Sequence, residues 1–152
     1  MNKTTYEREL AEKGILTYIT KGRSMRPFLR SGEDLVQIEA KKDSRFRKYD
    51  AVLYRRPDGK YVLHRIVKVL ADSYIICGDN CWQLERGITD SQILGVLSGV
   101  IRKGKKLDVN SRGYRLLVRL WCALYLPRAA FIYLRLKTMV IMKKLKDKLL
   151  GV

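Results

Sequence analysis

Residues 51–70 read AVLYRRPDGKYVLHRIVKVL, and they carry the clearest indication of the fold class. Two runs rich in Val, Leu, Ile and Tyr flank Pro57-Asp58-Gly59, a triplet that is typical of a tight turn. β-Branched and aromatic side chains pack well on a pleated, half-buried surface, so each run favours a strand. The stretch therefore predicts a β-hairpin whose second strand contains His64.

The residues on either side of this hairpin show the same pattern of short apolar runs, separated by turns that contain glycine, aspartate and serine. Many short strands at such spacing predict a mainly β fold with a compact, barrel-like body. Residues 4–13 predict a short amphipathic N-terminal helix, opened by Thr4 or Thr5 and closed by Gly14. The candidate strands are 15–19, 34–39, 50–55, 61–70, 73–77 and 93–101.

The 152 residues carry a net charge of +17, and most of that charge lies in the last third of the chain. Residues 1–101 contain 18 Lys and Arg against 13 Asp and Glu, whereas residues 102–152 contain 14 against 2. An apolar pattern with a basic stripe over 112–149 predicts a basic amphipathic helical region with a break or kink at Pro127. The expected domains are 1–104, a β domain with its N-terminal helix, and 105–152, a helical appendage.

The composition of residues 112–149 favours an anionic membrane surface as the partner of this region. A transmembrane span is less favoured, because a central arginine costs about 2.5–3.5 kcal/mol while each Leu, Ile, Val or Phe returns only about 0.3–0.6 kcal/mol. Packing of the apolar face on the body or on a protein partner is the remaining alternative. Nucleic acid is disfavoured, because the basic residues stand on helices that are mainly apolar. The oligomeric state stays open.

The cysteine and histidine content argues against a metal or other cofactor. His64 is the single histidine, which excludes sites built from several imidazoles. Cys77 and Cys81 have no second pair to complete a zinc site, and Cys122 lies far along the chain. Unpaired cysteines favour a reducing compartment. The first 22 residues include three glutamates and no apolar run, so we expect no signal peptide there and a location in the cytoplasm or peripherally on the cytoplasmic membrane face.

Three local features carry groups that could do chemistry. They are the segment Gly22-Arg23-Ser24-Met25-Arg26-Pro27, the strand residue His64, and Cys77-Gly78-Asp79-Asn80-Cys81 followed by Glu85-Arg86-Gly87. Each feature alone is ordinary, because serine near proline and Gly-Asp-Asn are common in turns and a strand histidine is usually structural. Their combination and order are what make them informative.

Together these features resemble the ordered signature of signal peptidases. That signature is Ser-Met-x-Pro, then a hairpin ending in His-Arg-Ile or His-Arg-Val, then Gly-Asp-Asn, then a short apolar pair before glycine. The resemblance covers about residues 15–101. It is closest to the endoplasmic-reticulum, archaeal and Gram-positive type, which uses Ser and His where other members and the LexA-like repressors use Ser and Lys. It implies a signal-peptidase/LexA-type β body and a serine peptidase that needs no cofactor.

The resemblance also implies roles for particular residues. Ser24 would be the nucleophile and His64 its general base, since a neutral hydroxyl needs a base beside it. The acid that orients His64 would be Asp79, which matches Gly-Asp-Asn, or Glu85, which stands where the family usually has aspartate. Asp90 is a third option.

The oxyanion and substrate region would comprise Gly22, Arg23, Met25 and Pro27, with the backbone N–H of Ser24 as a donor. Arg23 stands where the family usually has a small residue. Three consequences are open: the backbone suffices, the oxyanion hole is weaker, or Arg23 binds an acidic substrate.

The expected function is that of a serine endopeptidase which cleaves a peptide or the leader segment of a precursor protein through an acyl-enzyme. The alternative is a non-catalytic, peptidase-like module that binds anionic membrane or nucleic acid through its basic C-terminal helices.

Overall fold

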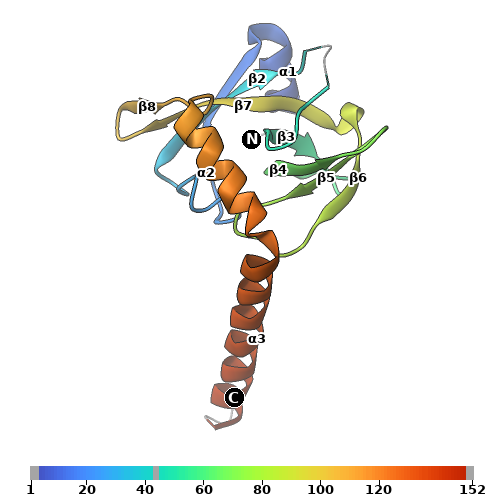
Figure 1. Ribbon diagram of the computed structural model, residues 1–152. Helices are drawn as coiled ribbons and strands as arrows, with labels where there is room; N and C mark the ends of the chain where they lie inside the picture. Colours follow the sequence, from blue (N-terminus) through green and yellow to red (C-terminus); the bar gives the residue numbers. More distant parts are fainter. Residues whose placement is uncertain (1–3, 43–44, 150–152) are drawn as a thin grey trace.

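The computed structural model describes residues 4–42 and 45–149 (Figure 1). The chain is mainly antiparallel β, with one short N-terminal helix and two C-terminal helices, so the coarse class predicted from the sequence is confirmed. The elements are α1 (Thr4–Lys13), β1 (Ile15–Ile19), β2 (Asp34–Ala40), β3 (Ala51–Arg55), β4 (Tyr61–Val69), β5 (Tyr74–Cys77), β6 (Glu85–Ile88), a 3₁₀ turn (Asp90–Gln92), β7 (Ile93–Arg102), β8 (Lys105–Leu107), α2 (Arg112–Ala123) and α3 (Tyr125–Leu149).

The strands form one sheet in the order β1-β2-β7-β3-β4-β5-β6, with β8 paired to β7. The pairings among the described strands make an open path, and none of them joins β1 to β6. The sequence did not predict β6 or β8. Both are short and polar, and they are extended because they pair with a neighbouring strand rather than because of their own pattern.

The predicted hairpin of residues 51–70 is confirmed as β3 and β4. Val52 pairs with His64 and Leu53 with Leu63, and the turn closes through the N–H of Arg56 and the carbonyl of Lys60. Because successive side chains on a strand point to opposite faces, His64 and its neighbour Arg65 lie on different faces of β4.

Two groups of buried apolar side chains form the core, one on each side of the central hairpin. Burial of each large aliphatic or aromatic side chain is worth about 1.5–3 kcal/mol, so these groups are the main source of stability. The first consists of Leu10, Leu16, Met25, Leu29, Val36, Ile38, Ala51, Leu53, Leu63, Leu97, Val100 and Val109. The second consists of Phe46, Val52, Tyr54, Ile66, Tyr74, Ile76, Ile88 and Ile93.

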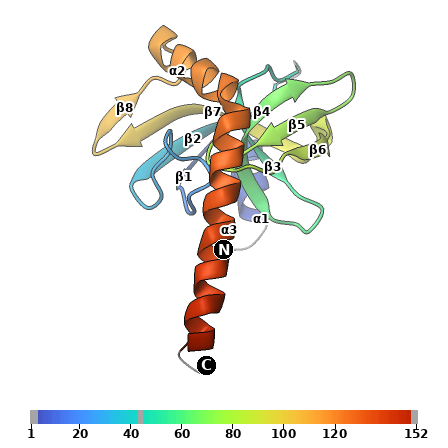
Figure 2. The same cartoon turned by 60° about the horizontal axis from the view of Figure 1, so that its bottom comes forward.

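Helix α2 packs on the body, and α3 projects away from it (Figures 1 and 2). The contact is made by the buried Val118 and by the ring of Phe28, which meets Tyr114 and Trp121 edge to face. Strand β8 belongs to the sheet, so the helical part begins at Arg112 and the boundary expected at residue 104 falls inside the β7–β8 hairpin.

The predicted break at Pro127 is wrong by three residues. The chain bends by 65° at Leu124, and Pro127 lies inside the first turn of α3. Proline is tolerated in the first turn of a helix, because the N–H group that it lacks would have no intrahelical partner there. If the helix continued through it, the proline ring would clash with the carbonyl four residues earlier. The helix therefore breaks before the proline rather than at it.

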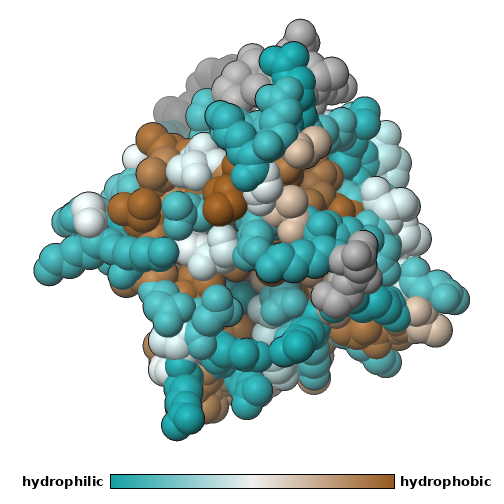
Figure 3. Space-filling model, turned by 90° about the horizontal axis from the view of Figure 1, so that it is seen from above, coloured by the Kyte–Doolittle hydropathy of each residue, from teal (hydrophilic) through white to brown (hydrophobic). Residues whose placement is uncertain are grey.

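No single helix in the described chain is both long enough and apolar enough to cross a membrane. Helix α2 and the part of α3 up to Lys143, which are bent relative to each other, have enough length and apolar composition only when they are counted together. The end of the body opposite α3 is mostly hydrophilic, with apolar patches between charged side chains (Figure 3).

Candidate functional site

Ser24, His64 and Glu85 come from three separate segments of the chain. Ser24 lies in the turn after β1, which is held by the N–H of Leu29 donating to the carbonyl of Met25 and by burial of both side chains. The carbonyl of Ser24 accepts a 2.7 Å hydrogen bond from the N–H of Asn80. The segment that contains Ser24 is therefore fastened to the turn that follows β5.

Gly78 shows how closely Ser24 and His64 approach each other. A methyl group at Gly78 would lie 2.8 Å from the carbonyl oxygen of Ser24 and 3.0 Å from Nε2 of His64. Only glycine fits between the serine backbone and the imidazole at this distance. The Ser24 hydroxyl does not hydrogen-bond to His64 here, which is common in unliganded sites because such bonds tighten when substrate binds.

His64 is 5% exposed, and its ring is oriented by a carboxylate. Nδ1 lies 3.0 Å from Oε1 of Glu85, with the Tyr54 hydroxyl 3.4 Å from the same nitrogen. An ionised carboxylate only accepts hydrogen bonds, so it selects the tautomer with the proton on Nδ1. Nε2 then carries a lone pair on the side of Gly78 and the Ser24 backbone.

The pKa of His64 is lowered from its ordinary value, chiefly because burial disfavours the charged ring. The charge and hydrogen bond of Glu85 raise the pKa and offset part of that effect. A lowered pKa keeps the imidazole neutral near pH 7, which is the protonation state that a general base requires.

Glu85 is itself held by Arg56, whose Nε donates to Oε2 at 2.7 Å. Burial alone would raise the pKa of the Glu85 carboxyl, but hydrogen bonds from Arg56 and Tyr54 and the charge of His64 together lower it. Glu85 is therefore ionised at neutral pH and able to orient His64.

Asp79 and Asp90 have other partners. Asp79 is 2% exposed, and its two carboxylate oxygens accept hydrogen bonds of 2.8 and 2.7 Å from Arg65, on the opposite face of β4 from His64. Asp90 pairs with Lys41 at 3.1 Å and accepts a 3.0 Å hydrogen bond from Tyr74. Of the three acids considered from the sequence, Glu85 is the one that the structure brings into contact with His64.

Of the residues expected around the oxyanion, three are exposed and one is buried. Gly22 has a φ of 92°, which favours glycine, and the Arg23 side chain is exposed. Pro27 is also exposed, whereas Met25 is buried in the first core group. Met25 therefore anchors the turn that contains Ser24, and its side chain does not lie on the surface.

Sequence reasoning missed the residues that support the site from a distance. Besides Arg56 and Tyr54, the indole of Trp121 donates to the carbonyl of Asp79 at 2.8 Å, and Tyr125 donates to the carbonyl of Trp82 at 2.6 Å. Helix α2 and the start of α3 thus hold the 79–82 turn to which Ser24 is bonded. No local pattern marks Trp121 or Tyr125, because their partners are more than 40 positions away.

The cysteines are free thiols in the structure. Burial, with a smaller contribution from Cys81, raises the pKa of the Cys77 thiol to about 12, so Cys77 is protonated and a poor nucleophile. Within residues 4–42 and 45–149, no group of three His, Cys, Asp or Glu side chains is arranged to hold a metal ion. Neither of the two cavities described in the structure is lined by Ser24 or His64.

No protein-family model and no curated protein sequence matches the chain.

Proposed function

We propose that the chain is a serine endopeptidase in which Ser24 is the nucleophile, His64 the general base and Glu85 the residue that orients His64. The observation that carries the proposal is the position of the buried imidazole. Its Nδ1 lies 3.0 Å from Glu85, and its Nε2 borders the glycine that separates it from the Ser24 backbone. Three motifs of the signal-peptidase signature, Ser-Met-x-Pro, His-Arg-Ile and Gly-Asp-Asn, meet around this point, which supports a signal-peptidase-like, barrel-like arrangement of the strands.

The chemistry follows from these positions. As Ser24 Oγ attacks the carbonyl carbon of a peptide bond, His64 Nε2 accepts the hydroxyl proton. The C–N bond breaks, and His64 returns the proton to the leaving amine. Water then hydrolyses the acyl-Ser24 ester, with His64 again accepting a proton, and the free serine is restored.

The negative charge that develops on the carbonyl oxygen needs hydrogen-bond donors. The Ser24 N–H makes no backbone hydrogen bond within the described chain, so it is available to the oxyanion. Asn80 holds the preceding peptide through a 3.3 Å hydrogen bond from its side-chain amide to the carbonyl of Arg23. The exposed Arg23 guanidinium lies beside this region, where it would favour an acidic residue in the substrate.

The proposed substrate is an exposed peptide or the leader segment of a precursor protein. The proposed location is the cytoplasm or the cytoplasmic face of a membrane, with residues 112–149 lying on an anionic membrane surface. Exposed leucines along α2 and α3, together with the cations between them, support this placement.

The proposal is tested with a peptide library. The wild-type protein, Ser24→Ala and the control Ser31→Ala are incubated with the library, and mass spectrometry identifies new N-termini. We expect a common set of new termini with the wild type and Ser31→Ala, and none with Ser24→Ala. Equal cleavage by Ser24→Ala would rule out Ser24 as the nucleophile, and no cleavage by the wild type would favour the non-catalytic module instead.

Replacing Glu85 with glutamine is expected to lower kcat/KM by about 10²-fold or more, because the amide can hold the wrong imidazole tautomer and cannot stabilise the imidazolium. Glu85 raises the pKa of His64 in the folded protein, so its loss lowers that pKa further. Since the neutral form of His64 is active, the acidic limb of the kcat/KM profile should move to lower pH. Profiles from pH 4 to 9 measure both effects.

The exposed Glu12 on α1 provides the control for this variant. Glu12→Gln removes the same charge far from His64 and should leave both the plateau and the acidic limb unchanged. An unchanged acidic limb in Glu85→Gln would contradict the assignment of Glu85 to His64.

A further inference from the structure

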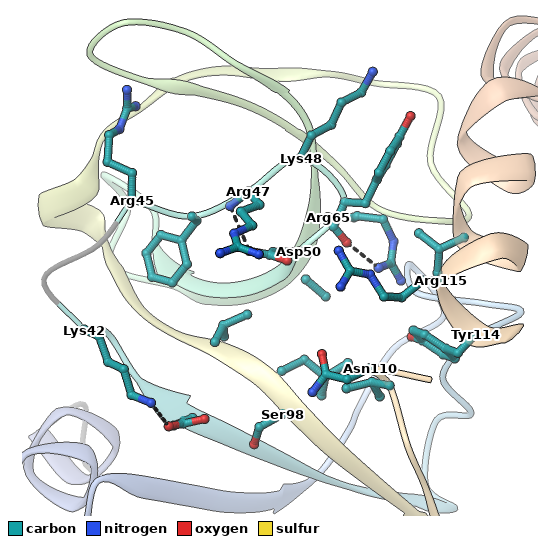
Figure 4. A pocket seen from close by; sticks show the side chains of 18 of the residues that line it. Lys42, Arg45, Arg47, Lys48, Asp50, Arg65, Ser98, Asn110, Tyr114 and Arg115 are labelled. Atoms are coloured by element: carbon teal, nitrogen blue, oxygen red, sulfur yellow. Dashed lines mark hydrogen bonds and ion pairs between the residues drawn. The ribbon is translucent and has the colours of Figure 1, made fainter. Parts of the chain in front are cut away.

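A second candidate site lies on the other face of β4 from His64. A cavity of about 320 Å³ opens between the 45–50 loop, β7 and α2 (Figure 4). The described part of its lining includes seven cationic side chains and only two carboxylates, Glu39 and Asp50. One of these, Glu39, forms an ion pair with Lys42. The cavity therefore has a strong excess of positive charge.

Several of these cations have no acidic partner within the described chain. Arg47 and Lys48 come from the loop, and Arg115 and Arg119 come from successive turns of α2. None of the four forms an ion pair with a described residue, whereas Arg65 donates to both carboxylate oxygens of Asp79 and to the carbonyl of Tyr49. Figure 4 shows Arg115 reaching from α2 into the cavity while Lys48 stands at its rim.

The inner wall contains a hydroxyl whose proton has no acceptor. The buried oxygen of Tyr114 faces the guanidinium of Arg65, which can only donate, and no acceptor for the hydroxyl proton lies within the described chain. Burial, first among its causes, raises the pKa of this phenol, so the hydroxyl keeps its proton and can donate. A buried donor without an acceptor is costly, which indicates that an external acceptor belongs there.

The helix that supplies two of the cations also presents a leucine face to solvent. Leu116, Leu117 and Leu120 are 56%, 60% and 55% exposed. Leu116 lies one turn from Arg119, so an apolar side chain and an unpaired guanidinium group are neighbours on α2. Leu117 and Leu120 continue the apolar face around the helix, outside the lining of the cavity.

We propose that this cavity binds the phosphate of an anionic phospholipid headgroup while the leucine face of α2 enters the adjacent acyl region. Guanidinium and phosphate pair through charge-assisted hydrogen bonds, and the Tyr114 hydroxyl supplies a further donor. A nucleic-acid backbone would satisfy the cations but leave the leucines in water, whereas a membrane interface accommodates both. The inference is independent of the peptidase activity and names the lipid group recognised in the membrane association proposed above.

The test uses the full chain and vesicle flotation. Vesicles of phosphatidylcholine alone are compared with vesicles that also contain phosphatidylglycerol. Arg115→Gln combined with Arg119→Gln should weaken binding to the anionic vesicles at least about tenfold. The control pair Lys105→Gln and Lys106→Gln removes the same charge from exposed β8 positions outside the cavity, and should weaken binding less than about threefold.

A third variant separates the cavity from membrane association in general. Leu117→Gln combined with Leu120→Gln changes two exposed side chains, so it should fold normally and yet lose vesicle binding. Loss in this variant with full binding by the arginine pair would overturn the cavity inference and leave membrane association standing. Equal loss in the arginine pair and the β8 control, or binding of duplex DNA in preference to anionic vesicles, would also overturn it. Circular dichroism confirms the fold of each variant.

Discussion

Replacing His64 with alanine is expected to lower kcat/KM for peptide cleavage by at least about 10³-fold, because Ser24 then has no base to accept its proton. Ser24→Ala should cause a loss of similar size. The two residues act as one unit, so kcat/KM of the double variant should be no lower than that of the less active single variant. Steady-state kinetics on a peptide from the library screen measures all three.

The controls for this comparison test whether the variants remain folded. His64 is buried, so His64→Gln is measured beside His64→Ala as a variant that leaves a smaller void. Thermal unfolding midpoints show whether either variant is destabilised. A double variant whose loss equals the product of the two single losses would mean that Ser24 and His64 act separately, and the proposed pairing would be wrong.

Removing the carboxylate of Asp79 is expected to have the largest effect on stability. Arg65 and Asp79 are each 2% exposed and are joined by two hydrogen bonds of 2.8 and 2.7 Å. Asp79→Ala would leave a buried guanidinium without its counter-charge, which costs about 3–5 kcal/mol. The free energy of unfolding, measured with urea at neutral pH, should fall by that amount.

Two further variants identify the cause. Asp58→Ala removes an exposed carboxylate that pairs with Lys60 and should cost less than about 1 kcal/mol. Arg65→Met combined with Asp79→Leu removes both buried charges, so it should be more stable than Asp79→Ala alone. If the double variant were the less stable of the two, the cost would lie in packing rather than in an unpaired charge.

The loss of Asp79 should also disturb the position of the segment that contains Ser24. Its turn carries the Asn80 N–H that binds the Ser24 carbonyl and the carbonyl that accepts the Trp121 indole. That turn therefore connects the β body, the Ser24 segment and α2. The aspartate of Gly-Asp-Asn is therefore best understood as a residue that positions Ser24, while Glu85 serves the imidazole.

Much of the fold could be predicted because its signals are local. The turn at Pro57-Asp58-Gly59 and the apolar runs beside it define the central hairpin without reference to the rest of the chain. The six predicted strands and the N-terminal helix appear close to their expected bounds. Strands β6 and β8 were missed because they depend on pairing with a neighbour, and the helix break was misplaced because proline acts on the turn before it.

The mainly β class, the basic helical end and the candidates Ser24 and His64 could be read from the chain, since residue types, turn chemistry and motif order are local properties. The choice among the acids required the folded structure. Glu85, Asp79 and Asp90 all carry a carboxylate that could orient His64. Strand pairing brings Glu85 of β6 to His64, whereas Asp79 lies against Arg65. The basic cavity is likewise a tertiary property, because it joins the 45–50 loop to α2, more than 60 residues away.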